Sequence, residues 1–431
     1  MKFLYKHTSS LQYIFILITI ILQLTKAERR ILEGKEPTND RNYVVYFIKA
    51  NASILYDTWL CGGAIVSPWY IITSAACVED VKYMYAIAGY SRYVTYDELD
   101  QDPCASYSRR RVVFKCLPMD YKFDYPRVER WANIDLALVK VEKPYDFNDE
   151  SFLDHQCTYI PNQIDINYDI NLQADGTNAI VFGWGHREKW RETNDTLDHN
   201  EKDLQYGSVK LASKEDCMDQ FDNQMLRGII EKYMICSIDK GNLDDAGEII
   251  GSDELPEDYY KRDCGPGALR MGRKCVPLRQ LMIRTRRNGI CQNDHGGPII
   301  TWRGPKEVLI GISSVFKVED GTQNCVGPFL YTSTHCNGEF IHCLMNTAQD
   351  GNMDQEDTRR CDALAKKNGY NIIRRTISWI GHPDGPAYNE INTHMRGKTA
   401  KSNVKIRQQA AKSNVKIRQN IRQQVPIRGR G

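Results

Sequence analysis

Three kinds of feature are absent from this chain of 431 residues, and each absence narrows what the protein can be. Its fourteen cysteines include no Cys-x-x-Cys pair, which argues against a structural zinc cluster. Beyond one apolar run near the start, no stretch is long enough to cross a bilayer. No acidic residue follows Glu390, whereas eleven Lys or Arg lie between Arg396 and Arg430. Since the whole chain carries a formal charge of +2, the part before this basic tail carries about −9.

The N-terminus is typical of a secretory signal. Lys2 and Lys6 precede the apolar run Tyr13–Leu24, and Thr25–Ala27 supplies small residues at a cleavage position. Residues 1–27 are therefore predicted to be a signal peptide. An uncleaved membrane anchor is the alternative, although a run of twelve residues is short for a bilayer span.

The cysteines and sequons agree with an extracellular location. Fourteen cysteines in a secreted chain indicate disulfides rather than free thiols. Asn51 and Asn194 each begin an Asn-x-Ser/Thr sequon and are predicted glycosylation sites, although such short motifs also occur by chance. The apolar content of 42% is sufficient for a sizeable core.

Short β segments separated by turn residues dominate from residue 43 onwards. They are rich in Val, Ile and Tyr, and so many spaced strands favour an all-β barrel or sandwich. The predicted strands are Tyr43–Ile48, Trp59–Val66, Tyr70–Thr73, Tyr83–Gly89, Leu136–Val141, Ala179–Trp184, Tyr206–Leu211, Pro298–Trp302, Val308–Val315 and Pro328–Tyr331.

Two motifs resemble the catalytic segments of chymotrypsin/trypsin-like serine proteases. Thr73–Cys77 (TSAAC) is similar to the family's Thr-Ala-Ala-His-Cys, and Cys291–Pro298 (CQNDHGGP) is similar to its Cys-Gln-Gly-Asp-Ser-Gly-Gly-Pro. Further matching segments follow in the family's order: Ile31–Gly34, Trp59–Ile65, Asn133–Leu138, Gly183–Gly185 and Ile377–Ile380. The resemblance covers most of residues 31–381. It implies a double six-stranded antiparallel β-barrel with a C-terminal helix, placed at Asn371–Ile380, and long inserted loops.

The resemblance also divides the chain. Residues 28–30 form a short pro-piece, residues 31–381 the protease-like domain, and residues 382–431 a basic low-complexity tail. Two stretches, near 238–290 and 337–370, are long insertions against the family pattern. Loops of this length are usually functional or disordered, so they are either a mobile solvated surface or a partner-binding surface.

Charge is unevenly distributed in the first insertion and in the tail. Residues 239–258 hold eight Asp or Glu, and residues 261–287 hold nine Lys or Arg. In the tail, Ala400–Gln408 recurs as Ala411–Gln419, a period of eleven residues. The tail is either a low-complexity extension or a contact for a polyanion such as a heparan-like glycan.

The catalytic motifs differ from the family at the residues that perform the reaction. Acyl transfer needs a hydroxyl nucleophile, an imidazole base and a carboxylate that orients the imidazole. By resemblance, Ala76 replaces the base and His295 replaces the nucleophilic serine, while Asp135 keeps the carboxylate. Catalysis is therefore not expected from this triad, and residual acceleration would be on the order of 10³ over water at best.

The substrate-binding positions are changed as well. Asn293 replaces the glycine that supplies an oxyanion-hole donor. Gly289 falls at the floor of the primary specificity pocket, where trypsin-like members carry aspartate. Ser314 and Phe316 fall on the segment that lines the pocket, and Phe316 replaces a glycine at its entrance. The benzyl group of Phe316 is expected to narrow or fill the slot.

The activation machinery is kept. The resemblance implies cleavage after Arg30, which frees the amine of Ile31 to pair with Asp294, although Glu33 departs from the usual glycine. A buried ammonium is tolerated where a carboxylate meets it. The alternative is that Arg29 and Arg30 are only a polar flank of the signal.

Disulfide pairs follow from the resemblance for six cysteines. These pairs are Cys61–Cys77, Cys217–Cys236 and Cys291–Cys325. The remaining pairings are guesses, since spacing does not determine connectivity. The most plausible ones are Cys157–Cys336, Cys104–Cys116, Cys264–Cys275 and Cys343–Cys361.

One hypothesis links the two substituted triad positions. Alanine at position 76 leaves space about the size of an imidazole, and cavities are costly. The ring of His295 could turn into this space and hydrogen-bond Asp135. A metal on His295 and Asp135 would lack a third ligand, and no cofactor is implied.

The expected function is that of a secreted, non-catalytic serine protease homologue. It would act by binding, as a cofactor, decoy or scaffold in a proteolytic pathway, with an active protease or a protease substrate as its protein partner. One alternative is an active serine-type endopeptidase with a non-standard site. Another is a secreted protein that binds polyanions through its basic tail.

Overall fold

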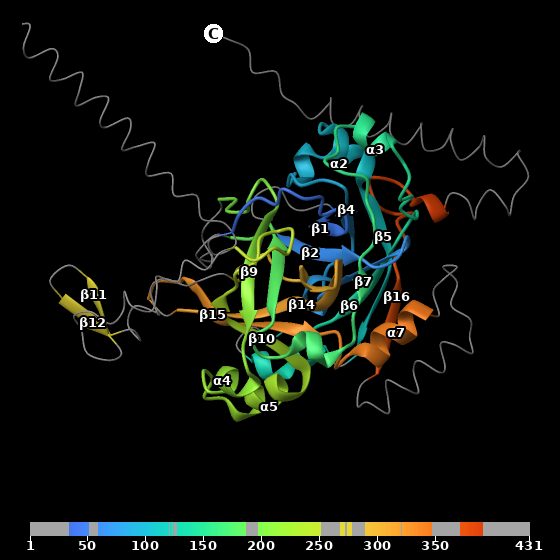
Figure 1. Cartoon of the computed structure of the whole chain (residues 1–431). Coiled ribbons are helices and arrows are strands. Elements are labelled where there is room, and N and C mark those ends of the chain that lie inside the picture. The colour runs from blue at the N-terminus through green and yellow to red at the C-terminus, as the bar shows by residue number, and fades with distance from the viewer. Residues whose placement is uncertain are drawn as a thin grey trace, which may run out of the picture. The chain divides into compact units, whose positions relative to one another are not determined.

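A computed structural model of the chain forms two units, residues 1–376 and residues 377–431 (Figure 1). The structure describes residues 34–50, 59–119, 121–122, 124, 127–186, 197–250, 268–271, 274–277, 289–319, 321–346 and 371–390. No helix within these ranges has the length and apolar character needed to cross a membrane.

The first barrel is a closed ring of six antiparallel strands. Its sheet order is β5-β4-β1-β2-β3-β6, and pairing between β5 and β6 closes the ring. Every residue of β2 and β3 is buried, and the nearly continuous apolar runs of these strands fill the barrel interior. The strands are β1 (Val44–Lys49), β2 (Leu60–Ile65), β3 (Tyr70–Thr73), β4 (Met84–Ile87), β5 (Arg110–Pro118) and β6 (Ala137–Val141).

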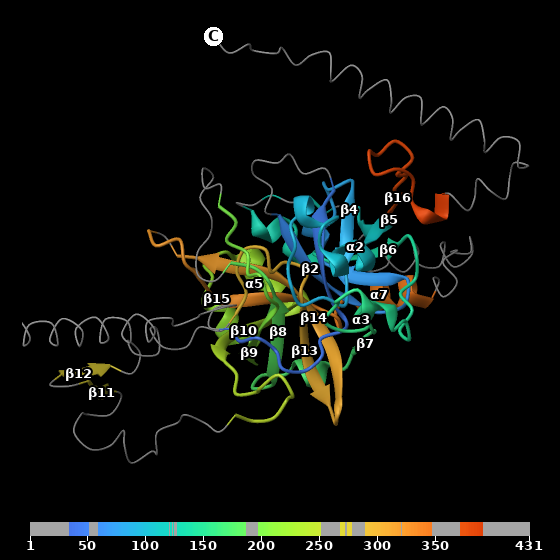
Figure 2. The ribbon, with the colours of Figure 1, turned by 90° about the horizontal axis from the view of Figure 1, so that it is seen from above.

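The second barrel has the same architecture in the order β13-β8-β9-β10-β15-β14, closed by pairing between β13 and β14. Ile235, Ile299 and Phe329 belong to its core, and none is more than 3% exposed. The green-to-orange strands of this barrel lie beside the blue-to-teal strands of the first barrel (Figures 1 and 2). The strands are β8 (Asn178–Gly183), β9 (Gln205–Leu211), β10 (Met234–Lys240), β13 (Pro298–Arg303), β14 (Lys306–Val318) and β15 (Cys325–Ser333).

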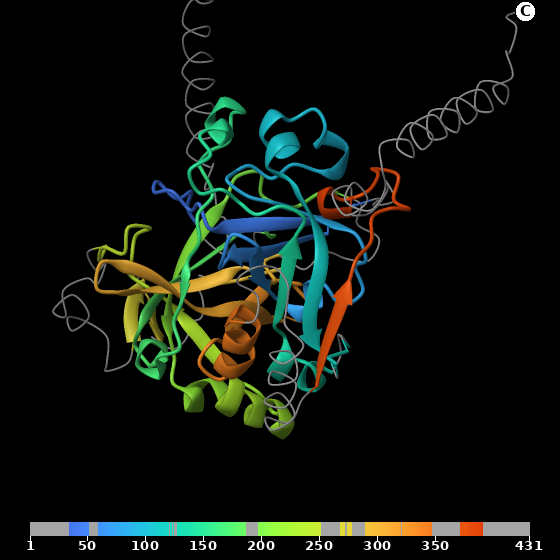
Figure 3. The same cartoon turned by 90° about the vertical axis from the view of Figure 1, so that its right-hand side faces the viewer.

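The predicted double six-stranded barrel is thus confirmed, and one strand is added to each barrel. β7 (Asp165–Ile166) pairs in parallel with β14. β16 (Ile372–Thr376) pairs antiparallel with β5, and the two strands run side by side in Figure 3. All ten predicted strands are present, nine of them with shifted ends, whereas β5 and β10 of the two barrels were not predicted.

The predicted helix at Asn371–Ile380 is wrong. Residues 372–376 form β16, and residues 377–379 have no regular secondary structure. Both the local sequence and a neighbouring strand explain why this segment is a strand and not a helix. β-branched Ile372 and Ile373 favour a strand, and β4 pairs only with Arg110 and Arg111 of β5, which leaves Phe114–Pro118 to pair with β16.

The helices of the described residues are few and short, and they lie outside the barrels. Asp102 and Asn223 cap α2 and α5 by accepting backbone N–H groups in the first turn. The α-helices are α2 (Pro103–Ser108), α3 (Ser151–Asp154), α4 (Lys214–Met218), α5 (Gln224–Tyr233) and α7 (Gly338–Asn346).

The disulfides confirm the three pairs implied by the resemblance, Cys61–Cys77, Cys217–Cys236 and Cys291–Cys325. The other two testable pairings are wrong, because Cys104 bonds to Cys157 rather than to Cys116. Cys104 lies on α2, which packs near α3 and so approaches Cys157 from a distant part of the sequence. Cys336 forms no disulfide with a described residue.

Part of the first insertion is described. Residues 242–250 form a turn in which Leu243 bridges Ile249, and β11 (Ala268–Met271) pairs with β12 (Lys274–Pro277). Several predicted features lie outside the described residues. They are the signal peptide, Arg30, Ile31, Asn51, Asn194, Cys264, Cys361, the side chains of Cys275 and Cys343, residues 347–370 and the tail beyond 390.

The second unit is described only over residues 377–390. Within it, the Glu390 carboxylate accepts the backbone N–H groups of Trp379 and Ala387 at 3.1 and 2.9 Å. Trp379 is fully buried and contacts the ring of His382 edge-on. These contacts give the segment a small core of its own.

Candidate functional site

The degenerate triad positions meet where the loops of the two barrels come together. Ala76 lies in the short helix η1 (Ala75–Cys77) after β3, and Asp135 follows η4 (Ala132–Ile134) just before β6. His295 lies in the loop before β13. The structure therefore brings together three predicted positions that are up to 219 residues apart in the sequence.

Asp135 is fully buried and bonded on both carboxylate oxygens. Its Oδ1 accepts the Ala76 backbone N–H at 2.9 Å, and its Oδ2 accepts the Ser314 hydroxyl at 2.5 Å. Its backbone carbonyl accepts the Thr332 hydroxyl at 2.9 Å. Both oxygens of this buried carboxyl group are thus satisfied by neutral donors, as buried polar groups require.

The hypothesis that His295 replaces the missing imidazole is wrong. Its ring makes no hydrogen bond or ion pair with Asp135, and its Nε2 is buried with no partner among the described residues. Burial lowers the pKa of His295, against the Asp135 charge and a hydrogen bond to the Ser314 backbone, which raise it. Each Asp135 oxygen instead accepts another donor, the Ala76 amide at Oδ1 and the Ser314 hydroxyl at Oδ2.

The loop around His295 is nevertheless fixed to both barrels. The Gly62 amide donates to the His295 carbonyl at 2.7 Å, and the Gly296 amide donates to the Ser313 carbonyl at 2.9 Å. Gly296 has a φ of +80°, and an added Cβ would meet Thr73 and Gly62. The backbone geometry of this loop therefore does not depend on which side chain stands at position 295.

Asn293 keeps the left-handed conformation that glycine adopts easily. Its φ is +72°, a region that asparagine tolerates better than most residues. Its side chain donates to Asn200 at 2.7 Å and lies 3.4 Å from His186 Nε2. The side chain is thus tied to the segments on either side of residues 187–196.

Asp294 is buried and unusually basic for a carboxyl group. Its oxygens accept the backbone N–H groups of Gly185 at 2.8 Å and Cys291 at 3.0 Å. Burial raises the pKa of Asp294 to about 7, which these hydrogen bonds oppose and the Glu201 charge favours. An added Cβ at Gly183 or Gly185 would strike the Asp294 carboxyl, so the Gly-Trp-Gly turn makes room for it.

The pocket positions hold aromatic rings. A Cβ at Gly289 would meet the ring of Phe329, which therefore covers the predicted pocket floor. Phe316 is half-buried and packs on the core cluster that contains Ile290 and Phe329. Its ring centroid lies 6.0 Å from that of His295. Phe316 thus contacts both the wall of the predicted pocket and the nucleophile position.

Sequence reasoning missed Tyr121 and the polar atoms around Asp135. Tyr121 is buried, and burial followed by the Asp135 charge raises its pKa. Its hydroxyl has no hydrogen bond among the described residues, and such buried groups are costly. No motif marks Tyr121 in the sequence. Three further buried atoms on the segments around Asp135 have no hydrogen-bond partner among the described residues. They are Ser74 Oγ, Ser313 Oγ and His295 Nε2.

Two side chains beside these positions that could supply a nucleophile are already engaged. Ser314 is fully buried and its hydroxyl is bonded to Asp135. Cys77 is bonded to Cys61. The described residues contain no group of three His, Cys, Asp or Glu side chains placed to hold a metal ion. They do form a pocket elsewhere that shares no residue with this site.

Comparison with known proteins agrees with this geometry. The trypsin family model matches residues 33–247, which span the first barrel and the first three strands of the second. The chain is 22% identical over 195 residues to venom serine protease 34 of Apis mellifera, covering 44% of this chain and 42% of that protein. It is 24% identical over 182 residues to snake venom serine protease 2B of Craspedocephalus gramineus, covering 42% and 59%.

A third relative is also similar over only part of each chain. Coagulation factor XI of Bos taurus is 25% identical over 158 residues, which cover 37% of this chain and 21% of that protein. The chain thus spans between about a fifth and three fifths of the length of these curated relatives.

Proposed function

Because this chain carries a domain of the trypsin family of serine proteases, we propose that it is a secreted, non-catalytic homologue that acts by binding another protein. The observation that carries the proposal is the bonding of Asp135. Its carboxylate is satisfied by the Ala76 amide and the Ser314 hydroxyl, with no imidazole between it and a nucleophile. In the triad mechanism the carboxylate orients an imidazole that takes the proton of the nucleophile, and positions 76 and 295 carry neither that imidazole nor a hydroxyl here.

The nucleophile position supports the same proposal. His295 has no hydroxyl, and its lowered pKa favours a neutral ring that is not oriented by Asp135. Phe316 packs on the pocket cluster and contacts the ring of His295, so substrate side chains have little room beside the site. Each change removes a separate requirement of acyl transfer.

A binding role follows from what the chain keeps. The two barrels, the four disulfides among the described residues and the fixed loop at Asp294 maintain a rigid protease-like surface. On this proposal the protein is a cofactor, decoy or scaffold, and its partner is an active protease or a protease substrate. The disulfides and the relatives named for venom and coagulation support a location outside the cell.

Active-site labelling tests the proposal. A fluorophosphonate probe, which reacts with activated serines, should leave the secreted protein unlabelled, and casein hydrolysis should stay at the level of buffer. The matched control is Ala76→His/His295→Ser, which restores base and nucleophile beside the intact Asp135. We expect this variant to label at a measurable rate. Covalent labelling of the unaltered protein would instead support the alternative, an endopeptidase with a non-standard site.

A further inference from the structure

The predicted primary specificity pocket is built from segments of the second barrel that the structure brings together. Gly289, its predicted floor, is buried, and the wall segment Ser313–Phe316 lies on β14 beside β15, with Val315 opposite Leu330. β15 also carries Phe329, which is 1% exposed. No motif marks Phe329 in the sequence, so its place in this pocket is a finding of the structure.

The ring of Phe329 lies directly on Gly289. A Cβ added to Gly289 would come within 2.2, 2.3 and 2.4 Å of three carbon atoms of the ring, and one added to Gly327 within 3.2 Å. Carbon atoms in contact are about 3.5 to 4.0 Å apart. Only glycine therefore fits at position 289 while the ring stays where it is.

The surroundings of the ring hold it in place. Phe329 belongs to the buried core cluster of the second barrel, and the half-buried Phe316 packs against that cluster. The disulfide Cys291–Cys325 joins the chain just after position 289 to β15. A ring enclosed in this way can leave its position only by opening a cavity, which is costly.

The glycine and the ring explain each other. By resemblance, an aspartate of trypsin-like members stands at the position of Gly289, and its Cβ alone would collide with Phe329. A carboxylate placed against an apolar ring without a cation would also carry a large desolvation cost. The missing aspartate and the added ring are therefore one coupled change of the pocket rather than two separate losses.

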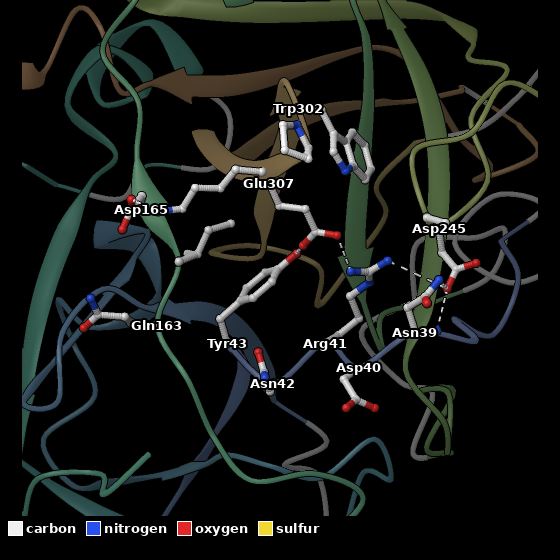
Figure 4. Close-up of a pocket in the computed structure, with 14 residues that line it drawn as sticks. Asn39, Asp40, Arg41, Asn42, Tyr43, Gln163, Asp165, Asp245, Trp302 and Glu307 are labelled. Carbon is white, nitrogen blue, oxygen red and sulfur yellow. Dashed lines mark hydrogen bonds and ion pairs between the residues drawn. The ribbon is translucent and has the colours of Figure 1, made fainter. Parts of the chain in front are cut away.

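A pocket that is open among the described residues is a different one. It has a volume of about 450 Å³ and is lined by residues 39–43, 163–165, 245–246, 302 and 305–307 (Figure 4). In Figure 4, Arg41 points toward Glu307 and Asp245, with which it forms ion pairs. A ligand held there would be bound equally by variants at position 329. Differences between such variants therefore report on the Phe329 site alone.

We propose that Phe329 is a built-in occupant of the primary specificity pocket and that the partner of this protein binds without inserting a side chain there. The phenyl ring stands where active members of the family receive a substrate side chain. This inference rests on the proposed binding function and narrows it. A decoy role toward inhibitors or substrates that anchor themselves in this pocket is excluded, whereas contacts with the outer surface of the domain remain available.

Failure of this inference and failure of the proposed function give different results, because fluorophosphonate labelling depends on the triad positions and not on Phe329. The contact itself is tested by packing in the full-length protein. Gly289→Ala should lower the urea midpoint of unfolding, because the new methyl group meets the Phe329 ring. In a Phe329→Ala background the same substitution should lower the midpoint by about half as much or less.

Gly228→Ala is the matched control for this comparison, since a Cβ at position 228 meets nothing within 4 Å. Its urea midpoint should not fall. Equal losses from Gly289→Ala in the two backgrounds would overturn the inference, because the ring would then not lie on the pocket floor.

Ligand binding tests the occupancy. The probe is N-acetyl-4-fluorophenylalanine amide, whose ring can enter a pocket that opens to solvent, and fluorine NMR measures its affinity. Phe316→Gly/Phe329→Ala, which opens the entrance and the floor, should bind the probe at least about tenfold more tightly than Phe316→Gly does. The gain is expected because the probe's ring replaces the ring of Phe329.

Phe316→Gly/Phe152→Ala is the matched control, because Phe152 is fully buried and lies outside the core cluster of the second barrel. Its affinity should equal that of Phe316→Gly. Circular dichroism checks that each variant is folded, and the glycine comparison decides if the double variant is not. A folded Phe316→Gly/Phe329→Ala variant that binds the probe no more tightly than Phe316→Gly would overturn the inference.

Discussion

The Ser314 hydroxyl donates to the buried carboxylate of Asp135 at 2.5 Å and occupies one of its two oxygens. The other oxygen accepts the Ala76 amide at 2.9 Å. A buried carboxylate without such donors would be expensive. These hydrogen bonds satisfy Asp135 although Ala76 stands where the family has a histidine beside this carboxylate.

This network predicts the effect of removing the Ser314 hydroxyl. Ser314→Ala should lower the free energy of unfolding by about 1 to 3 kcal/mol, because Asp135 stays buried with one donor fewer. Urea unfolding followed by intrinsic fluorescence measures the change. In the background of Asp135→Asn, the same substitution should cost less, since no charge is left unsatisfied. Equal costs in both backgrounds would show that the two groups do not interact.

Phe316 should control whether the predicted specificity pocket can take a ligand. Phe316→Gly removes a benzyl group that packs on the core cluster of the second barrel, so it should both destabilise the protein by a few kcal/mol and open space for a flat aromatic molecule. Indole binding, measured by isothermal titration calorimetry, should appear in the variant and not in the unaltered protein. Benzamidine should gain no advantage over indole, because Gly289 supplies no carboxylate. Phe316→Leu, which keeps the space filled, is the control.

The resemblance to the serine protease motifs predicted the double barrel, and segments rich in Val, Ile and Tyr located most of its strands. Strand β5 was not predicted, because Arg110, Arg111 and Lys115 interrupt its apolar pattern. The charged end of Lys115 is nevertheless buried, and its Nζ donates to the carbonyls of Val78 and Val81. A long side chain that buries its stem and finds local acceptors is not visible as a core residue in sequence.

The sequence predicted which residues meet at the site, but not which hydrogen bonds they form. Motifs located Ala76, Asp135 and His295, and the structure places them together. They could not show that Ser314 rather than His295 donates to Asp135, because that choice depends on which side chain reaches the acid in three dimensions. The predicted pairings Cys104–Cys116 and Cys157–Cys336 failed for a similar reason, since Cys104 bonds to Cys157. Proximity of α2 and α3 is a tertiary fact that cysteine spacing does not encode.

The basic tail gives a prediction that rests on charge alone. Deleting residues 396–431 removes eleven Lys or Arg and should lower the NaCl concentration at which the protein elutes from heparin, because phosphate- and sulfate-type contacts release counterions. The control replaces these residues by glutamine at constant length. Unchanged elution in both variants would eliminate a polyanion-binding role for the tail.

Asp294 predicts how stability depends on pH in the chain that is still uncut at Arg30. Its folded pKa of about 7 lies above its ordinary value, so its contribution to stability is fully present near pH 4 and is lost as the pH rises through 7. The free energy of unfolding should fall over that interval by up to about 4 kcal/mol. Asp294→Asn should flatten this part of the profile, because the amide does not titrate.

Cleavage after Arg30 should flatten the same part of the profile by a different route. The freed Ile31 amine would supply a cation for the ionised Asp294, which lowers its pKa and makes the charged form stable in the folded protein. Urea unfolding of cut and uncut protein at pH 4 to 8 therefore separates the two forms. The cut form should be more stable at pH 8, and Asp294→Asn should abolish that difference. If the pH profiles of the cut and uncut proteins match, the Ile31 amine does not reach Asp294. The fold would then retain Asp294 although no ion pair with the new N-terminus forms.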